Sequence, residues 1–187
     1  DPGYVMDDAD LDAAVDSRMD GALYNAGQCC CGIERIYVHH SLYHDFVEKA
    51  VAWVNKLKLG NPFDADSTIG PMANKRFAEV VRGQIRDAIT DGAKPLIDPA
   101  RFPEDDGGAY LAPQILVNVN HEMRVMREES FGPVVGIMSV KDDEEAIAAM
   151  NDSPYGLTCA LWTGDPDRAA AIGARLETGT IFMNRCD

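Results

Sequence analysis

The sequence is poor in positive charge and has no long apolar run. Lysine and arginine number 17 against 31 aspartate and glutamate residues, so the formal net charge is −14. A nucleic-acid or anionic-membrane surface needs clustered basic residues, so we expect neither partner. No apolar stretch reaches the length of about 18 residues that a membrane-spanning helix needs. The opening DPGYVMDDAD also lacks the basic and apolar regions of a signal peptide.

The cysteines do not form the pattern of a disulfide scaffold. They lie at positions 29, 30, 31, 159 and 186, so their number is odd and three are contiguous. Secreted disulfide-rich domains are short and carry many spaced cysteines. We therefore expect a reducing, cytoplasmic setting. With 46% hydrophobic and 26% charged residues over 187 positions, the chain has the composition of a globular domain with a buried core.

Apolar periodicity predicts helices that alternate with strands. Helices are expected at 8–24, 42–58, 74–90, 142–151 and from Pro166 onward, and strands at 35–38, 94–97, 115–117, 134–140, 158–162 and 180–183. This alternation predicts an α/β fold, with a largely parallel sheet flanked by helices. The polar loop 98–109 does not divide it, because strand candidates resume at once, so we expect one domain over 1–187.

Helix boundaries and faces follow from the same pattern. We expect Ser41 to cap the helix 42–58, and Asp165 followed by Pro166 to begin the last helix. The side chains expected to face inward from helix 74–90 are Phe77, Val80, Val81, Ile85, Ala88 and Ile89.

The stretch NAGQCCCGIERIYV, residues 25–38, places three thiols between a helix and a strand. Zinc sites use spaced pairs such as C-x-x-C, and His40 and His44 lack the glutamate of an H-E-x-x-H pattern, so we expect no metal. A buried cysteine can be simple packing, which is our interpretation of Cys159 within a strand. After a glycine turn, however, backbone N–H groups can stabilise a thiolate or an oxyanion. These arguments predict a reactive thiol without deciding which of the three it is.

Four segments together resemble a known family. Residues 25–30 (NAGQCC) resemble the N-x-G-Q-x-C pattern of the NAD(P)-dependent aldehyde dehydrogenases, and residues 128–134 (EESFGPV) resemble their E-E-x-F-G-P-V block. Residues 151–157 (NDSPYGL) and 179–184 (GTIFMN) resemble two later blocks of the same family in the same order. The resemblance extends over the whole chain and implies the family's catalytic domain.

The resemblance implies a role for particular residues. Cys30 would be the nucleophile that adds to an aldehyde and carries the resulting thiohemiacetal and thioester, while Cys29 and Cys31 would pack into the core. Glu129 would accept hydrogen bonds from the nicotinamide-side ribose of NAD or NADP. Phe131 would pack near that ribose and the nicotinamide, and Leu157 would line the nicotinamide pocket.

Two further charged residues have a structural interpretation beside a functional one. Lys75 is either an exposed helix residue or a neighbour of the adenosine ribose, and the first is the plainer interpretation. Glu34 is interpreted as a structural ion-pairing residue and not as the catalytic base.

The family's general base is a glutamate in an upstream L-E-L-G-G block that this sequence does not contain. We therefore expect a piece of a longer protein, without the cofactor-binding domain and the C-terminal oligomerisation segment, and inactive alone. The full-length protein would be a homodimer or homotetramer that acts on a small-molecule aldehyde. The alternatives are a CoA-acylating aldehyde dehydrogenase, a cysteine hydrolase that pairs Cys30 with a histidine such as His121, and a thiol-reactive domain without redox activity.

Overall fold

Seven strands form one sheet in the computed structural model, which describes residues 1–186. The strands are β1 (Pro2–Val5), β2 (Arg35–His39), β3 (Lys94–Pro95), β4 (Gln114–Val117), β5 (Val134–Val140), β6 (Thr158–Trp162) and β7 (Thr180–Met183). Their order is β3-β4-β5-β2-β1-β6-β7, and every neighbouring pair is parallel except β3 with β4. The predicted α/β fold with a largely parallel sheet is confirmed.

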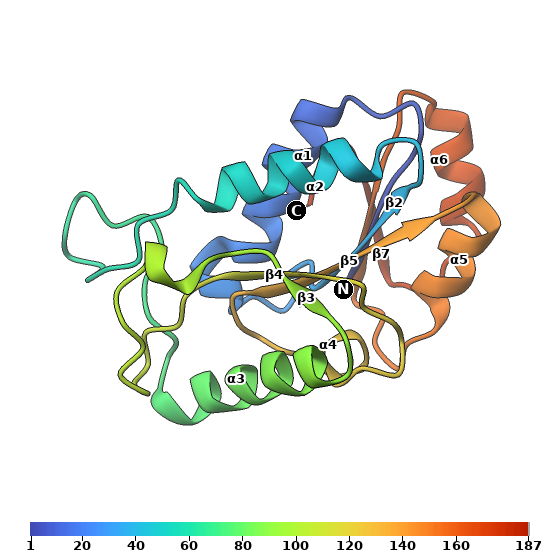
Figure 1. Cartoon of the computed structure of the whole chain (residues 1–187). Helices are drawn as coiled ribbons and strands as arrows, with labels where there is room; N and C mark the ends of the chain where they lie inside the picture. Colours follow the sequence, from blue (N-terminus) through green and yellow to red (C-terminus); the bar gives the residue numbers. More distant parts are fainter. Residues whose placement is uncertain (187) are drawn as a thin grey trace.

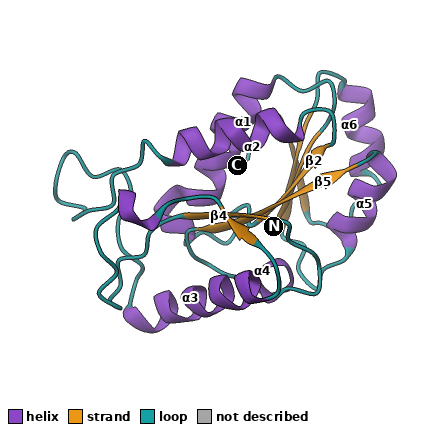
Figure 2. Cartoon of the chain, in the orientation of Figure 1, coloured by secondary structure: helices purple, strands orange, loops and turns teal. Residues whose placement is uncertain are grey.

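Helices cover both faces of this sheet (Figures 1 and 2). They are α1 (Leu11–Leu23), α2 (Tyr43–Val54), α3 (Lys75–Thr90), α4 (Arg124–Arg127), α5 (Asp143–Asn151) and α6 (Pro166–Gly173). The core beneath α1 and α2 contains Val5, Ile36 and Ala160, whereas their strand neighbours Tyr4 and Leu161 face the core beneath α5 and α6. A third cluster lies beneath α3 and α4. Because successive side chains on a strand alternate between faces, a sheet covered on both faces has continuous apolar strands.

The N-cap residues of the helices test the helix starts that the sequence predicted. Asp10, Asn74, Asp142 and Asp165 cap α1, α3, α5 and α6, each accepting a hydrogen bond from a backbone N–H of the first turn. The predicted start at Asp165 and Pro166 is thus confirmed. The prediction for Ser41 was wrong, because Leu42 is the N-cap residue of α2 and the Ser41 hydroxyl bonds His39 Nδ1 at 2.8 Å.

The inward face predicted for α3 was partly wrong. Phe77, Val80 and Ile89 are 51%, 46% and 41% exposed. Arg82 and Gln84 are buried in their place, because Arg82 forms a bidentate ion pair with Asp105 and Gln84 reaches the backbone of the 128–133 segment. Apolar periodicity cannot identify a helix face whose inward positions are polar side chains with distant partners.

The central strand β1 was not expected at all. Its sequence, PGYV, reads as a turn, yet all its residues are buried between β2 and β6. A Cβ at Gly3 would overlap the guanidinium of Arg18, a buried residue whose Nη2 donates to Tyr4 O at 2.9 Å. Tertiary pairing therefore decides this strand, since its intrinsic propensity is low. None of the helices in the described part of the chain is long and apolar enough to span a membrane.

Candidate active site

Three of the four segments singled out in the sequence meet at one edge of the sheet, and the fourth, 179–184, contains β7. Residues 25–34 lead into β2, 128–133 lead into β5 and 153–157 lead into β6. In a parallel sheet the amino ends of all strands lie at the same edge, and β5, β2, β1 and β6 are consecutive neighbours. Segments far apart in the sequence are therefore brought together at the amino edge.

The turn before the cysteines has an unusual backbone. Asn25, Ala26 and Gly27 have φ angles of 52°, 55° and 74°, so consecutive residues are left-handed. The turn is closed by Asn25, whose carbonyl accepts from Gln28 N at 3.1 Å and whose Nδ2 donates to Gln28 O at 3.0 Å. Left-handed alanine is strained, and such strain persists only where the surroundings enforce it, as at functional sites.

The three cysteines have different environments. Cys30 is exposed, and Cys29 and Cys31 are half-buried beside it with their Sγ atoms 3.3 Å apart. The expectation that these neighbours pack into the core was wrong, because the turn directs both side chains to the same side and against each other. The hydrogen bond from Cys29, followed by burial, raises the pKa of Cys31 to about 11. Cys31 therefore stays a thiol near neutral pH.

The cysteine turn and the 128–133 segment touch through their backbones. A Cβ at Gly27 would overlap the carbonyl group of Gly132, and a Cβ at Gly132 would come within 2.5 Å of Val81. Glycine is needed at Gly27 both for its positive φ and for this approach. The sequence marked these glycines only as turn formers.

Gln28 ties the cysteine turn to the segment before α3. Its Oε1 accepts from Ala73 N at 2.6 Å, and its Nε2 donates to Asn25 O at 2.9 Å and Pro71 O at 3.3 Å. A primary amide suits this position because it donates and accepts at once. Glutamate could not make the same set of contacts.

Side chains from three parts of the chain hold the backbone of residues 129–131 in place. Glu34 accepts hydrogen bonds from Ser130 N at 2.9 Å and Phe131 N at 2.8 Å. Gln84 Nε2 donates to Glu129 O at 3.4 Å, and the Tyr155 hydroxyl accepts from Glu129 N at 3.3 Å. Within residues 1–186 the Glu34 carboxylate accepts hydrogen bonds from backbone N–H groups and forms no ion pair. Glu34 is therefore an anchor of the 129–131 backbone and not the ion-pairing residue that the sequence suggested. Burial raises the pKa of Glu34, although these two N–H groups act in the opposite direction.

A pocket of about 150 Å³ opens beside the exposed thiol. Cys29, Cys30, Glu129, Tyr155 and Leu157 are among the residues that line it. Leu157 is 52% exposed, so its apolar side chain faces an open space. The Glu129 side chain is exposed and makes no hydrogen bond or ion pair with any residue in 1–186.

Two other predicted residues lie outside this pocket. Phe131 is 39% exposed and holds a left-handed conformation with φ of 49°, but it is not one of the lining residues. Lys75 is the first residue of α3 and is exposed.

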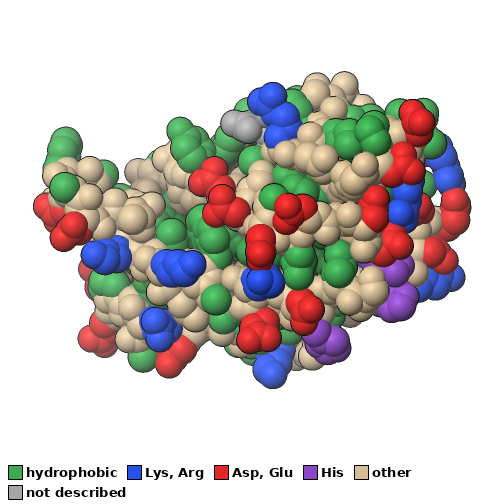
Figure 3. Space-filling model, turned by 90° about the horizontal axis from the view of Figure 1, so that it is seen from above, with side chains coloured by type: hydrophobic (Ala, Val, Ile, Leu, Met, Phe, Trp, Pro, Cys, Tyr) green, Lys and Arg blue, Asp and Glu red, His purple; other side chains and the backbone are tan. Residues whose placement is uncertain are grey.

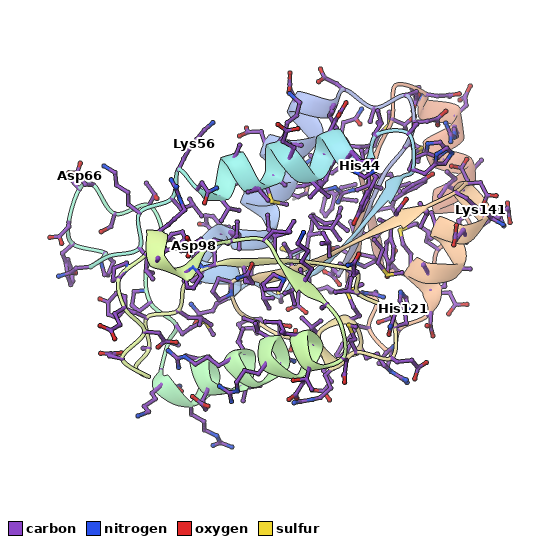
Figure 4. The ribbon with its side chains drawn as sticks, in the orientation of Figure 1. His44, Lys56, Asp66, Asp98, His121 and Lys141 are labelled. Atoms are coloured by element: carbon purple, nitrogen blue, oxygen red, sulfur yellow. The ribbon has the colours of Figure 1, made fainter. Side chains whose placement is uncertain are left out.

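The histidines are not placed to activate Cys30. His121 Nε2 bonds the Tyr37 hydroxyl at 2.9 Å and its Nδ1 bonds Asp152 at 2.7 Å, so both ring nitrogens are engaged. His44 lies on α2, at the opposite side of the sheet from His121 (Figure 4). Within residues 1–186, no group of three or more His, Cys, Asp or Glu could hold a metal ion.

The side of the molecular surface shown in Figure 3 has no cluster of basic residues, because Lys and Arg side chains are dispersed there among Asp and Glu.

An exposed cysteine on a strained turn, beside a pocket with an unpaired carboxylate, is typical of an enzyme that uses a thiol nucleophile. These features define the class of the protein as an α/β domain with an exposed thiol beside a pocket.

The chain belongs to the aldehyde dehydrogenase family, whose family model matches residues 1–187. It is 36% identical over 183 residues to mouse retinaldehyde dehydrogenase 3, covering 98% of this chain and 35% of that protein. It is 40% identical over 180 residues to 3-sulfolactaldehyde dehydrogenase of Priestia aryabhattai, covering 96% of this chain and 37% of the relative. The chain therefore spans little more than a third of these relatives.

Solved structures agree with the assignment. NADP-dependent glyceraldehyde-3-phosphate dehydrogenase from Bacillus halodurans C-125, complexed with NADP, matches with a TM-score of 0.92 and 38% identity, covering 99% of this chain and 38% of that one. Betaine aldehyde dehydrogenase from Staphylococcus aureus, in complex with NAD+, matches with a TM-score of 0.92 and 33% identity, covering 99% and 37%. The resemblance found in the sequence is confirmed.

Proposed function

We propose that residues 1–187 form the nucleophile-bearing catalytic domain of an NAD(P)-dependent aldehyde dehydrogenase that converts an aldehyde to a carboxylic acid. The observation that carries this proposal is the exposed Cys30 thiol beside a pocket that it shares with the unpaired Glu129 carboxylate. The relatives act on chemically different aldehydes by name, so the proposal extends to the aldehyde group and not to one substrate.

The residues at this edge fit a dinucleotide cofactor. The Glu129 carboxylate is exposed without a partner, and a carboxylate can accept hydrogen bonds from two adjacent ribose hydroxyls. Phe131, two residues later, presents a partly exposed ring, and Leu157 adds an apolar wall. When bound, the nicotinamide of NAD or NADP supplies the two-electron acceptor. In this proposal Glu129, Phe131 and Leu157 bind the cofactor.

Cys30 supplies the covalent chemistry. Its thiolate would add to the aldehyde carbon and place a negative charge on the former carbonyl oxygen. The Cys30 N–H donates to no acceptor within residues 1–186, so it is available to stabilise that oxygen. After oxidation the carbon is held as a thioester on Cys30, and water releases the acid.

The carboxylate of Glu34 is not the base for these steps. Glu34 lines the same pocket as Cys30, but each of its oxygens already accepts a backbone N–H of the 129–131 segment. The hydrolase alternative lacks support for a related reason, since both nitrogens of His121 are engaged with other groups. We infer that the base and most of the cofactor site come from outside residues 1–187.

Mass-spectrometric mapping of iodoacetamide labelling in the full-length protein tests the proposal. Cys30 should label first, NAD+ or NADP+ should change its rate, and an aldehyde should generate reduced cofactor. The isolated chain should show negligible oxidation, because loss of general base catalysis alone removes a factor of about 10² to 10⁴. First labelling at another cysteine, with no cofactor effect, would contradict the proposal.

A further inference from the structure

The 129–131 segment is held by side-chain bonds to its backbone and not by its own secondary structure. It follows α4 and precedes β5, and its N–H and C=O groups find partners on α3, on residues before β2, and in the turn before β6. Of these contacts, the two to Glu34 are the shortest, at 2.8 and 2.9 Å. Hydrogen bonds to an ionised acceptor are roughly twice as strong as those between neutral groups.

Glu34 also bonds the adjacent strand β5 through its main chain. Its carbonyl accepts from Gly136 N of β5 at 3.0 Å, while its two carboxylate oxygens accept from Ser130 and Phe131. The same residue ends the cysteine turn and immediately precedes β2. The positions of Cys30 and of the segment that carries Glu129 are therefore fixed relative to each other through one residue.

The carboxylate also offsets an unfavourable backbone conformation. Phe131 has a φ of 49°, a conformation that is unfavourable for a residue with a Cβ. Glu34 Oε1 bonds the N–H of this same residue. Without that bond the left-handed conformation has less support, and Phe131 and Glu129 would lose a fixed orientation.

We propose that Glu34 is the positioning residue of the cofactor site, holding Glu129 and Phe131 in the orientation that binds the nicotinamide end of NAD(P)+ beside Cys30. Glu34 does not touch the cofactor and acts only through the backbone of residues 129–131. The inference rests on the proposed function, because it assigns NAD(P)+ to this edge.

The proposal requires a carboxylate of this length. In Glu34→Gln one acceptor oxygen becomes an NH₂ group, which faces a backbone N–H and cannot accept from it. In Glu34→Asp both acceptors remain but are withdrawn by one methylene. Glu34→Asp should therefore recover part of what Glu34→Gln loses.

Cofactor affinity in the full-length protein is the decisive measurement. Titration calorimetry with NAD+ and NADP+ should show roughly tenfold weaker binding for Glu34→Gln, the effect of losing one hydrogen bond to a charged group. The labelling rate of Cys30 without cofactor should stay within about twofold of wild type, since the exposed thiol is untouched. The change that cofactor causes in this rate should shrink.

Asp8→Asn is the matched control. The Asp8 carboxylate accepts from the Thr163 hydroxyl and from Gly164 N at 3.0 Å, so it also anchors a backbone segment, at the opposite edge of the sheet. The cofactor affinity of Asp8→Asn should equal that of wild type, even if the melting temperature of this variant is lower. Should Glu34→Gln not fold, Glu34→Asp with an intermediate affinity would carry the test.

The outcomes separate the two proposals. Unchanged affinity in Glu34→Gln, or an equal loss in Glu34→Gln and Asp8→Asn, overturns the role of Glu34. If wild type binds NAD(P)+ but oxidises no aldehyde, only the proposed function fails, and the affinities still decide on Glu34. If wild type binds neither cofactor, both proposals are overturned.

Discussion

The two edges of the sheet differ in how they treat left-handed backbone. At the carboxyl edge, beyond β4 and β7, the left-handed residues are Asn118 and Asn184, a type that tolerates this conformation. At the amino edge they include Ala26 and Phe131, which do not. Strain is therefore concentrated at the edge that carries the exposed Cys30 thiol and the pocket.

The edges also differ in the forces that hold them. Arg168 binds Asp143 and Asp7 at 2.7 Å beside the carboxyl edge, so ion pairs act there alongside the hydrogen bond that Asp8 accepts from Gly164 N. At the amino edge the anchors Gln28 and Glu34 bond backbone groups of neighbouring segments. Because backbone groups cannot be repositioned by a rotamer change, such anchors define the geometry of a loop more closely than surface ion pairs do.

The largest expected effect is the loss of activity on replacing Cys30, compared with replacing its neighbour Cys29. Cys30→Ser in the full-length protein should reduce kcat/KM for aldehyde oxidation by about 10⁴-fold or more, because the nucleophile is lost. Cys29→Ser is the control and should stay within about tenfold of wild type, since only the contact with Cys31 changes. Equal losses in steady-state kinetics would remove the distinction between the cysteines.

Glycine substitutions compare a crowded turn with an open one. Gly27→Ala should lower the free energy of unfolding by about 3 kcal/mol or more, since it combines a positive φ with a clash against backbone. Gly92→Ala also has a positive φ, of 106°, but nothing lies within 4 Å, so it should lose only about 1 kcal/mol. Urea denaturation measures both. Similar losses would mean that the contact with Gly132 is unimportant.

Two carboxylates should respond to pH in opposite directions. Burial raises the pKa of Glu34 above its ordinary 4.5, so its contribution to folding stability falls as the pH rises from there through its folded-state pKa. The hydrogen bond from Arg168 lowers the pKa of Asp143 below 3.8, so its contribution is present above that value and is lost as the pH falls through the folded-state pKa.

Denaturation midpoints between about pH 3 and 7 check these signs. In Glu34→Gln the loss of folding stability as the pH rises above 4.5 should be smaller than in wild type. In Asp143→Asn the loss of folding stability as the pH falls below 3.8 should be smaller than in wild type. Profiles that change in the same direction in both variants would contradict the assignment of opposite shifts.

The smallest expected effect concerns the unstrained edge. Asn118→Ala should lower the free energy of unfolding by about 0.5 to 1 kcal/mol, because alanine tolerates a φ of 56° less well than asparagine. Asn118→Gly should be close to neutral by the same reasoning. Thermal unfolding of the pair measures the difference, and an alanine variant as stable as wild type would show that this edge does not depend on asparagine.

Sequence patterns were most informative where local chemistry decides the structure. The strand Thr158–Trp162, the start of α6 at Asp165 and the burial of Cys159 were all predicted correctly. The convergence of three of the four motifs was implicit as well, since each of the three leads into a strand of a parallel sheet, whereas the motif at 179–184 contains a strand itself.

The remaining features depend on partners that are distant in the sequence. Nothing local distinguishes the buried Gln84 from a surface residue of a helix, and PGYV becomes a strand only between β2 and β6. Glu34 looked like a member of an ion pair because its backbone partners are about a hundred positions away, at Ser130 and Phe131. Long-range pairing of this kind is not encoded in periodicity.

The contact between Gly27 and Gly132 has a consequence for redesign of this enzyme. Because main chain meets main chain there, the spacing between the cysteine turn and the 128–133 segment, which would bind the cofactor in the proposed function, cannot change without moving the backbone. In the proposed enzyme, side chains that neither bind the cofactor nor bond the 129–131 segment could then be exchanged to admit other aldehydes without changing that spacing. Substrate range and reactive geometry would in this way be separable properties.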